Sequence, residues 1–194
     1  MGLCDALVQR VSYTGDLGYE IYVDADEQVS LYHTLTEAAD GLGLKPFGMR
    51  AMMSLRLEKS FGSWLREFKP DYLPGETGMD RFVAYNKPVD FIGKAAVMAE
   101  KVNGPARKLC TFVVDAEDAD VWGDEPIWID DEVRGFVTSG GCAHYSRKSV
   151  AIGYVPSELI RSGLEVEIEI LGTRRKGFML DEPLYDPKAE RMRG

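Results

Sequence analysis

Cysteine and histidine are scarce in this sequence. The three cysteines, Cys4, Cys110 and Cys142, are odd in number and far apart, and there are only two histidines, His33 and His144. This spacing excludes a disulfide framework and predicts free thiols in a reducing compartment, for which we expect the cytoplasm. Neither histidine has an acid or a nucleophile at an informative spacing, so both are interpreted as structural and no metal site is expected.

Long hydrophobic runs and an excess of positive charge are also lacking. No window approaches the roughly 18 apolar residues of a membrane span. Residues 1–5 have neither the basic nor the apolar part of a signal peptide. We therefore expect no membrane partner. The net charge of −9 disfavours nucleic-acid binding, which needs cationic side chains to neutralise phosphates.

The negative charge is concentrated in residues 115–132, which contain acids but no Lys or Arg and account for the whole excess. This segment is interpreted as a solvated loop and strand face. A calcium-binding loop is excluded, because the alternating acids and the central glycine of such a loop are missing.

A change of pattern near Asn103-Gly104-Pro105 predicts two domains, 1–103 and 104–194, within the 194 residues. In the first domain, a helix with Asp26 as N-cap is expected to bury a stripe that includes Leu31 and Leu35. The order strand-turn-strand-helix-helix indicates an α+β layer, a sheet with helices on one side. The expected strands are 6–13, 19–24 and 80–85, the expected helices are 26–40, 49–59 and 94–101, and 61–78 is expected to be a long loop.

The second domain has an all-strand pattern. Six short strands separated by turn residues predict a small antiparallel barrel or sandwich. Residues 165–170 alternate strictly, and their acids could pair with the basic residues 174–176 across a tight turn. Ser139-Gly140-Gly141 is interpreted as a hairpin turn. The expected strands are 108–115, 127–129, 133–139, 150–155, 164–171 and 174–180.

The segment Ser12–Glu20 (SYTGDLGYE) combines a glycine-rich turn with an acid at the start of a strand. Its hairpin would bring Tyr13 near Tyr19 and Glu20. A carboxylate such as Glu20 can accept two adjacent N–H donors, the pattern presented by the amino-pyrimidine edge of a pterin. From composition alone, an exposed strand acid without a ligand is the alternative.

The helix at 49–59 follows Gly48 and has two faces of different character. Met49, Met52, Met53 and Leu57 share one face, which we expect to lie in the core. Arg56 and Glu58 are the notable charged residues of this helix, and ion pairing within the fold is the expectation for both.

Taken in order, six segments of the chain resemble the glycine-cleavage T-protein (aminomethyltransferase) family. The resemblance is strongest to the branch of that family formed by the C-terminal portions of dimethylglycine and sarcosine dehydrogenases. The matching segments are Ser12–Glu20, Gly48–Ser60 with Ser63-Trp64, Pro74–Met79, Asp90–Lys94, Val137–Gly141 and Ile152–Val155.

This resemblance implies a partial folate-binding α/β-sandwich domain followed by a C-terminal β-barrel, with tetrahydrofolate as cofactor. It implies that Glu20 binds the pterin and that Tyr13 lines the folate pocket. Trp64 either packs the loop or lines a ring-binding pocket. Where T-proteins have an arginine that helps to hold folate, this chain has Met52. FAD would belong only to a further N-terminal domain of the dehydrogenase branch, since no dinucleotide fingerprint is present.

The activity implied by the resemblance is transfer of a one-carbon unit from an aminomethyl donor of glycine-cleavage, dimethylglycine or sarcosine type to tetrahydrofolate. The family's catalytic Asp lies in a preceding portion that has no counterpart here, so no catalytic residue is assigned and this stretch alone is expected to be inactive. Its partners would be folate, the amine donor and that N-terminal portion, or a second copy through the same face. A noncatalytic folate-binding or assembly module is the alternative, whereas the related iron–sulfur or tRNA maintenance proteins have a signature segment that this chain lacks.

Overall fold

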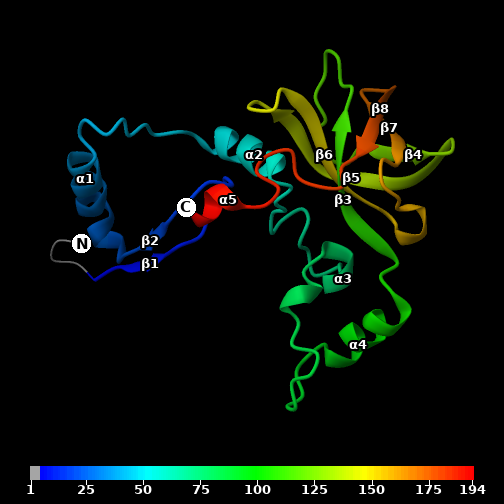
Figure 1. Ribbon diagram of the computed structural model, residues 1–194, viewed down its shortest axis with the longest axis horizontal. Coiled ribbons are helices and arrows are strands. Elements are labelled where there is room, and N and C mark those ends of the chain that lie inside the picture. Colours follow the sequence, from blue (N-terminus) through cyan, green and yellow to red (C-terminus); the bar gives the residue numbers. More distant parts are fainter. Residues whose placement is uncertain (1–4) are drawn as a thin grey trace.

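The computed structural model describes residues 5–194 and is of mixed α/β type (Figure 1). A β-barrel lies at one end, and an N-terminal hairpin with one helix lies at the other. Helix α2 (Met49–Glu58) lies between them, and the C-terminal residues return from the barrel to the hairpin. Cys4 lies outside the described residues.

The C-terminal half is a closed antiparallel barrel with the strand order β3-β6-β5-β4-β7-β8. All six predicted strands are present, and the barrel resolves the choice between barrel and sandwich. Its core is a cluster of aliphatic residues around Phe112, Ile127 and Ile168, which are fully buried. The strands are β3 Arg107–Val114, β4 Pro126–Ile129, β5 Glu132–Ala143, β6 Lys148–Pro156, β7 Glu165–Ile170 and β8 Thr173–Met179.

The interpretation of Ser139-Gly140-Gly141 as a hairpin turn is wrong, because these residues lie inside β5. The register between β5 and β6 shifts between Val137 and Ser139, which is a β-bulge. Because a bulge bends a strand and re-aims its side chains, the glycines continue the strand around the barrel instead of ending it.

The N-terminal hairpin is confirmed but is shorter than expected. Strand β1 (Leu7–Gln9) pairs with β2 (Glu20–Tyr22), with Val8 opposite Ile21. A one-turn 3-10 helix, η1 (Ala25–Glu27), precedes helix α1 (Gln28–Ala38). Asp26 therefore lies inside η1 and does not cap the helix, since Glu27 occupies that position.

The expected burial of the α1 stripe is wrong. Helix α1 has no buried residue, and Tyr32 and Leu35 are exposed on its surface. Among residues 5–48, Gly15 alone is buried. The spacing predicted the helix correctly, but β2 and the residue after it cover its apolar face only in part, so that Leu31 is half-buried beside a hollow.

Helix α2 ends one residue before the predicted position, and its expected apolar face is buried only toward the C-terminal end, where Leu57 is buried, while Met52 and Met53 are half-buried. Met49 is 68% exposed, whereas Arg56, Leu57 and Glu58 are buried. The C-terminal turn of α2 packs on β5 and β6, with Leu57 in a second small core beside Val150. Polar side chains are buried here because each meets several partners.

The segment after α2 is mostly loop, as expected, and contains one short helix, α3 (Pro74–Thr77). The strand expected at 80–85 is wrong: Asp80–Phe82 form a 3-10 turn, η2. Helix α4 (Lys94–Asn103) ends where β3 is about to begin, and the division of the chain at 103/104 remains a prediction. The remaining short elements are η3 (Ser157–Leu159) and α5 (Glu190–Arg193).

The acidic segment 115–132 is only partly a solvated face. Arg175 pairs with Glu117 and Asp118, so two of its acids meet a base from β8. Arg174 pairs with both Asp131 and Glu167, which confirms one ion pair across the β7–β8 hairpin. The basic residues of this hairpin thus also form ion pairs with the acidic segment.

Candidate functional site

The glycine-rich turn of Ser12–Glu20 is docked against the end of α2. Gly15 has a φ of +94°, and a Cβ at this position would lie 3.1 Å from Cδ of Lys59. This backbone conformation and this close approach both favour glycine. The turn therefore holds the preceding residue, Thr14, and its neighbour Tyr13 at a fixed place beside the loop that follows α2.

Tyr13 is half-buried, and its hydroxyl donates a hydrogen bond to the carbonyl oxygen of Gly62 at 3.2 Å. Burial raises the pKa of Tyr13 above its usual value, with Arg56 acting in the opposite direction and Glu67 adding to the rise. The phenol therefore stays protonated at physiological pH and can act as a donor. It joins the glycine-rich turn to the loop that carries Trp64.

Glu20 is exposed at the start of β2, and its carboxylate accepts a hydrogen bond from the hydroxyl of Tyr22. That hydrogen bond raises the pKa of Tyr22 above its usual value, and the negative charge of Glu20 adds to the effect. Among the described residues, Tyr13 and Glu20 make no hydrogen bond to each other. A carboxylate offers about four lone-pair sites, so Glu20 retains acceptor capacity for a ligand.

Trp64 lies on the loop after α2 and is 82% exposed, so it does not pack within the described chain. The loop beneath it is anchored: the backbone carbonyl of Ser63 accepts hydrogen bonds from the N–H groups of Glu67 and Phe68 at 3.0 and 3.1 Å. A large aromatic ring displayed on an anchored loop is available for stacking on a planar ligand.

Sequence reasoning missed the buried polar cluster beneath this loop. Glu67 is fully buried, lies 3.4 Å from Arg56 and accepts a hydrogen bond from the hydroxyl of Ser139. The expected ion pairing of Arg56 within the fold is thus confirmed. Glu58 is held by the backbone N–H groups of Tyr145 and Ser146, at 2.8 and 3.0 Å. No local pattern marked Glu67, because its partner in the barrel is 72 positions away.

The C-terminal residues clasp the same turn from the other side (Figure 1). Lys59 pairs with Asp186 at 3.0 Å, and the hydroxyl of Tyr185 donates to Asp16 at 2.8 Å. Arg10 donates to backbone carbonyls of the last helix, α5. Tyr13 and its turn are thus held between the loop after α2 and the chain's last residues.

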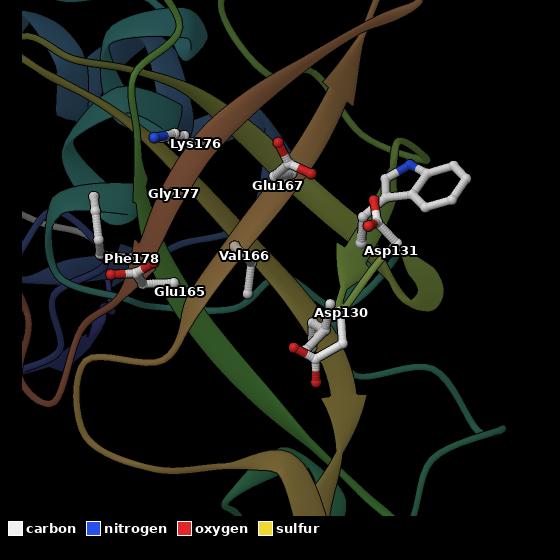
Figure 2. Close-up of a pocket in the computed structure, with 10 residues that line it drawn as sticks. Asp130, Asp131, Glu165, Val166, Glu167, Lys176, Gly177 and Phe178 are labelled. Carbon is white, nitrogen blue, oxygen red and sulfur yellow. The ribbon is translucent and has the colours of Figure 1, made fainter.

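A cavity of about 310 Å³ between β4, β7 and β8 is not the candidate site. Figure 2 shows Glu165 and Glu167 on β7 and Asp130 on the turn after β4, with side chains that do not converge on one point. No group of acids, histidines and cysteines suited to a metal ion occurs among residues 5–194. These acidic walls would also repel an anionic ligand.

Neither described cysteine is a candidate nucleophile. Cys110 and Cys142 are both free, as expected. Burial raises the pKa of the Cys110 thiol to about 11, and burial with the nearby acids raises that of Cys142. Both thiols therefore stay protonated near neutral pH. Within residues 5–194, none of the helices is long and apolar enough to cross a membrane.

The barrel and the clasped turn define a recognisable class of protein module. Residues 1–87 match the family model described as GCVT N-terminal domain, and residues 107–186 match that of the glycine cleavage T-protein C-terminal barrel domain. A solved structure of glycine cleavage system aminomethyltransferase T from Bartonella henselae superposes with a TM-score of 0.85 at 25% identity, over 94% of this chain and 50% of that one.

Curated relatives agree with this match. Human mitochondrial dimethylglycine dehydrogenase is 41% identical over 175 residues, which is 90% of this chain and 20% of that protein. The aminomethyltransferase of Symbiobacterium thermophilum is 35% identical over 184 residues, or 95% of this chain and 49% of that one. The chain belongs to the glycine-cleavage T-protein (aminomethyltransferase) family. It spans about a fifth of the dehydrogenase and about half of the aminomethyltransferase.

Proposed function

We propose that this chain is the tetrahydrofolate-binding part of an aminomethyltransferase-type enzyme that transfers a one-carbon unit from an aminomethyl donor to tetrahydrofolate. The observation that carries the proposal is the hydrogen bond from Tyr13 to Gly62. It joins the motif that contains Glu20 to the loop that displays Trp64. An acceptor of two N–H donors and a protonated phenol can hydrogen-bond to the edge of a pterin, and an exposed indole can stack on its ring.

In the proposed complex, the Glu20 carboxylate accepts the two N–H donors of the pterin's amino-pyrimidine edge. The hydroxyl of Tyr22, which donates to that carboxylate in the ligand-free chain, either keeps its hydrogen bond beside the pterin or rotates away. Trp64 covers a face of the ring system. The chemistry of the transfer itself is assigned to no residue of this chain.

Calorimetric titration with tetrahydrofolate tests the proposal. Because each hydrogen bond to a charged acceptor contributes roughly 1.5–3 kcal/mol, the loss of two in Glu20→Ala should weaken binding about a hundredfold or more. Glu37→Ala, on the exposed surface of α1, is the matched control and should bind as the unaltered chain does. Equal binding by all three proteins would refute the role of Glu20, and no binding by any would refute folate binding by this chain.

A partner portion is part of the same proposal. The N-terminal hairpin and α1 expose a face of apolar side chains, and the aminomethyltransferase relatives contain about as much chain again as this one spans. We propose that a polypeptide like that remaining half covers this face, in the same chain or in another. The exposed side chains include Leu7, Tyr22, Val29, Tyr32 and Leu35.

Sedimentation velocity distinguishes the possible occupants of this face. The chain is mixed with the half of the Symbiobacterium thermophilum aminomethyltransferase that it does not match, and a 1:1 complex is the expected result. Self-association of the chain alone, which is lost in Tyr32→Asp, would instead assign the face to a second copy. Monomers under both conditions would contradict the proposal.

Met52 favours a second candidate, a noncatalytic folate-binding or assembly module. In the family, an arginine at this position helps to hold folate, and Met52 cannot replace its charge. Met52→Arg should tighten tetrahydrofolate binding if the pocket is otherwise intact, and an unchanged affinity would favour the noncatalytic module.

The two described cysteines are free, which supports a reducing compartment. We propose the cytoplasm, whereas the human relative is named as mitochondrial.

A further inference from the structure

The Gly62–Trp64 segment takes part in the proposed folate site at both of its ends. Within the described chain, neither end is held by its own side chain. Gly62 contributes a carbonyl oxygen, which accepts from Tyr13, and Trp64 is exposed. The residue between them, Ser63, is fixed through its backbone. Its N–H donates to Oε2 of Glu67 at 2.7 Å.

The Glu67 carboxylate receives donors from three parts of the molecule. Besides Ser63 in the loop, Nη1 of Arg56 in α2 lies 3.4 Å from Oε2, and the hydroxyl of Ser139 in β5 donates to Oε1. The backbone carbonyl of Glu67 also accepts from the hydroxyl of Tyr154 in β6, at 2.7 Å. A fully buried carboxylate with this set of partners has little freedom to move, since each displacement leaves a buried polar group unpaired.

We propose that Glu67 is a positioning residue for the folate site. Its carboxylate accepts hydrogen bonds from Ser63 in the loop and from Ser139 in the barrel. It therefore fixes the Gly62–Trp64 segment, and with it Trp64 and the partner of Tyr13, relative to the barrel. This inference rests on the proposed function, since the segment matters only if it meets the ligand. Residues that hold a binding group in place commonly act in this indirect way, by locking the backbone and rotamers of the groups that touch the ligand.

Two neighbouring hydroxyls of β5 provide a matched pair for a test. Ser139 donates to Glu67, whereas Thr138 donates to the carbonyl of Ile152 within the barrel at 3.0 Å. Both are buried, and the register shift between Val137 and Ser139 accompanies their different directions. Ser139→Ala and Thr138→Val each remove one buried hydroxyl and one hydrogen bond from the same strand. Only Ser139→Ala removes a hydrogen bond to Glu67.

The experiment uses the whole chain labelled with 5-fluorotryptophan, in which the ¹⁹F signal of Trp64 is assigned with Trp64→Phe. We expect Ser139→Ala to shift or broaden the Trp64 signal of the ligand-free protein. It should also raise the Kd for tetrahydrofolate about fivefold, less than the roughly tenfold or greater loss when a whole charge-assisted hydrogen bond to a ligand is removed. Thr138→Val should change neither quantity, and Ser139→Thr, which keeps the hydroxyl, should restore both.

Glu67→Gln is the stronger variant, and circular dichroism establishes that it is folded before its ¹⁹F signal is compared. The inference is overturned if Ser139→Ala leaves the Trp64 signal unchanged, or if Thr138→Val moves it equally. It is also overturned if the signal moves while the affinity of a folate-binding chain does not. If the unaltered chain does not bind tetrahydrofolate, the proposed function fails, and the ¹⁹F comparison still decides whether Glu67 positions the segment.

Discussion

The two ends of this molecule are built on opposite principles. The barrel encloses a continuous aliphatic core, in which Phe112, Ile127 and Ile168 are fully buried. Residues 5–48 bury Gly15 alone, and they are attached through polar contacts such as Tyr13 to Gly62 and Tyr185 to Asp16. Burial of apolar surface is the main source of stability. The comparison therefore shows a self-supporting barrel that carries an N-terminal part which depends on its attachments.

The largest expected effect breaks the barrel. Phe112→Ala should lower the free energy of unfolding by about 3–5 kcal/mol, because it removes a fully buried aromatic ring and leaves a cavity. Phe47→Ala is the matched change in the N-terminal part, where the ring is 61% exposed, and it should cost no more than about 0.5 kcal/mol. Urea unfolding of both variants measures the difference. Equal losses would contradict the contrast between the two ends.

The second effect loosens the join between α2 and the barrel. Glu58→Gln should cost about 2 kcal/mol, since the buried backbone N–H groups of Tyr145 and Ser146 would meet a neutral amide in place of a carboxylate. Glu37→Gln, on the exposed face of α1, should leave the unfolding midpoint unchanged. A midpoint that is the same in both variants would mean that Glu58 does not hold the join.

The third effect is local and concerns the contacts of the C-terminal segment with the glycine-rich turn and with Lys59, which we call the clasp. Asp186→Asn should speed amide hydrogen exchange several-fold at residues 12–22 and leave the barrel amides unchanged, because Lys59 would lose its charged partner. Asp181→Asn removes the charge of an exposed acid in the same C-terminal segment and is the control. Uniformly faster exchange throughout the chain would show instead that the two ends unfold together.

The same clasp should depend on pH. Burial opposes ionisation of Asp186, but its hydrogen bond from Lys59 and those from the backbone of Glu190 and Arg191 win, so its pKa lies below its usual value. A carboxyl with a lowered pKa stabilises the fold fully above its unfolded pKa of about 4, and this contribution is lost as the pH falls through the lower folded value. NMR signals of the Gly15 amide should report this loss only below about pH 4. A transition near neutral pH would contradict this assignment.

The smallest effect concerns the surface of the barrel. Glu167→Gln removes one of two partners of Arg174, whose guanidinium also pairs with Asp131 and stacks on Trp128. Partly exposed ion pairs contribute little, so the expected cost is about 0.3 kcal/mol. Thermal unfolding in low and high salt measures it, and the difference should vanish in high salt. A cost above that of Glu58→Gln would reverse the ranking.

The six strands of the barrel could be predicted from the sequence because their signals are local, whereas their closure into a barrel was implied by the family resemblance. Strict alternation at 165–170 and the turn residues between strands require no knowledge of distant partners. The resemblance of two segments to the family nominated Tyr13, Glu20 and Trp64, and their contacts with a ligand remain predictions. Glu67 and Asp186 were missed, since their partners lie 72 and 127 positions away and no local pattern encodes such contacts. The burial of Met49 was misjudged because periodicity predicts which residues share a face, not which turns of the helix are covered.

The most direct measurement is amide hydrogen exchange of the whole chain with and without tetrahydrofolate. If the turn and loop together form the folate site, bound ligand should slow exchange at residues 12–22 and 60–67 and leave strands β3 to β8 unchanged. Protection confined to the barrel, or no change anywhere at saturating tetrahydrofolate, would contradict the proposed site.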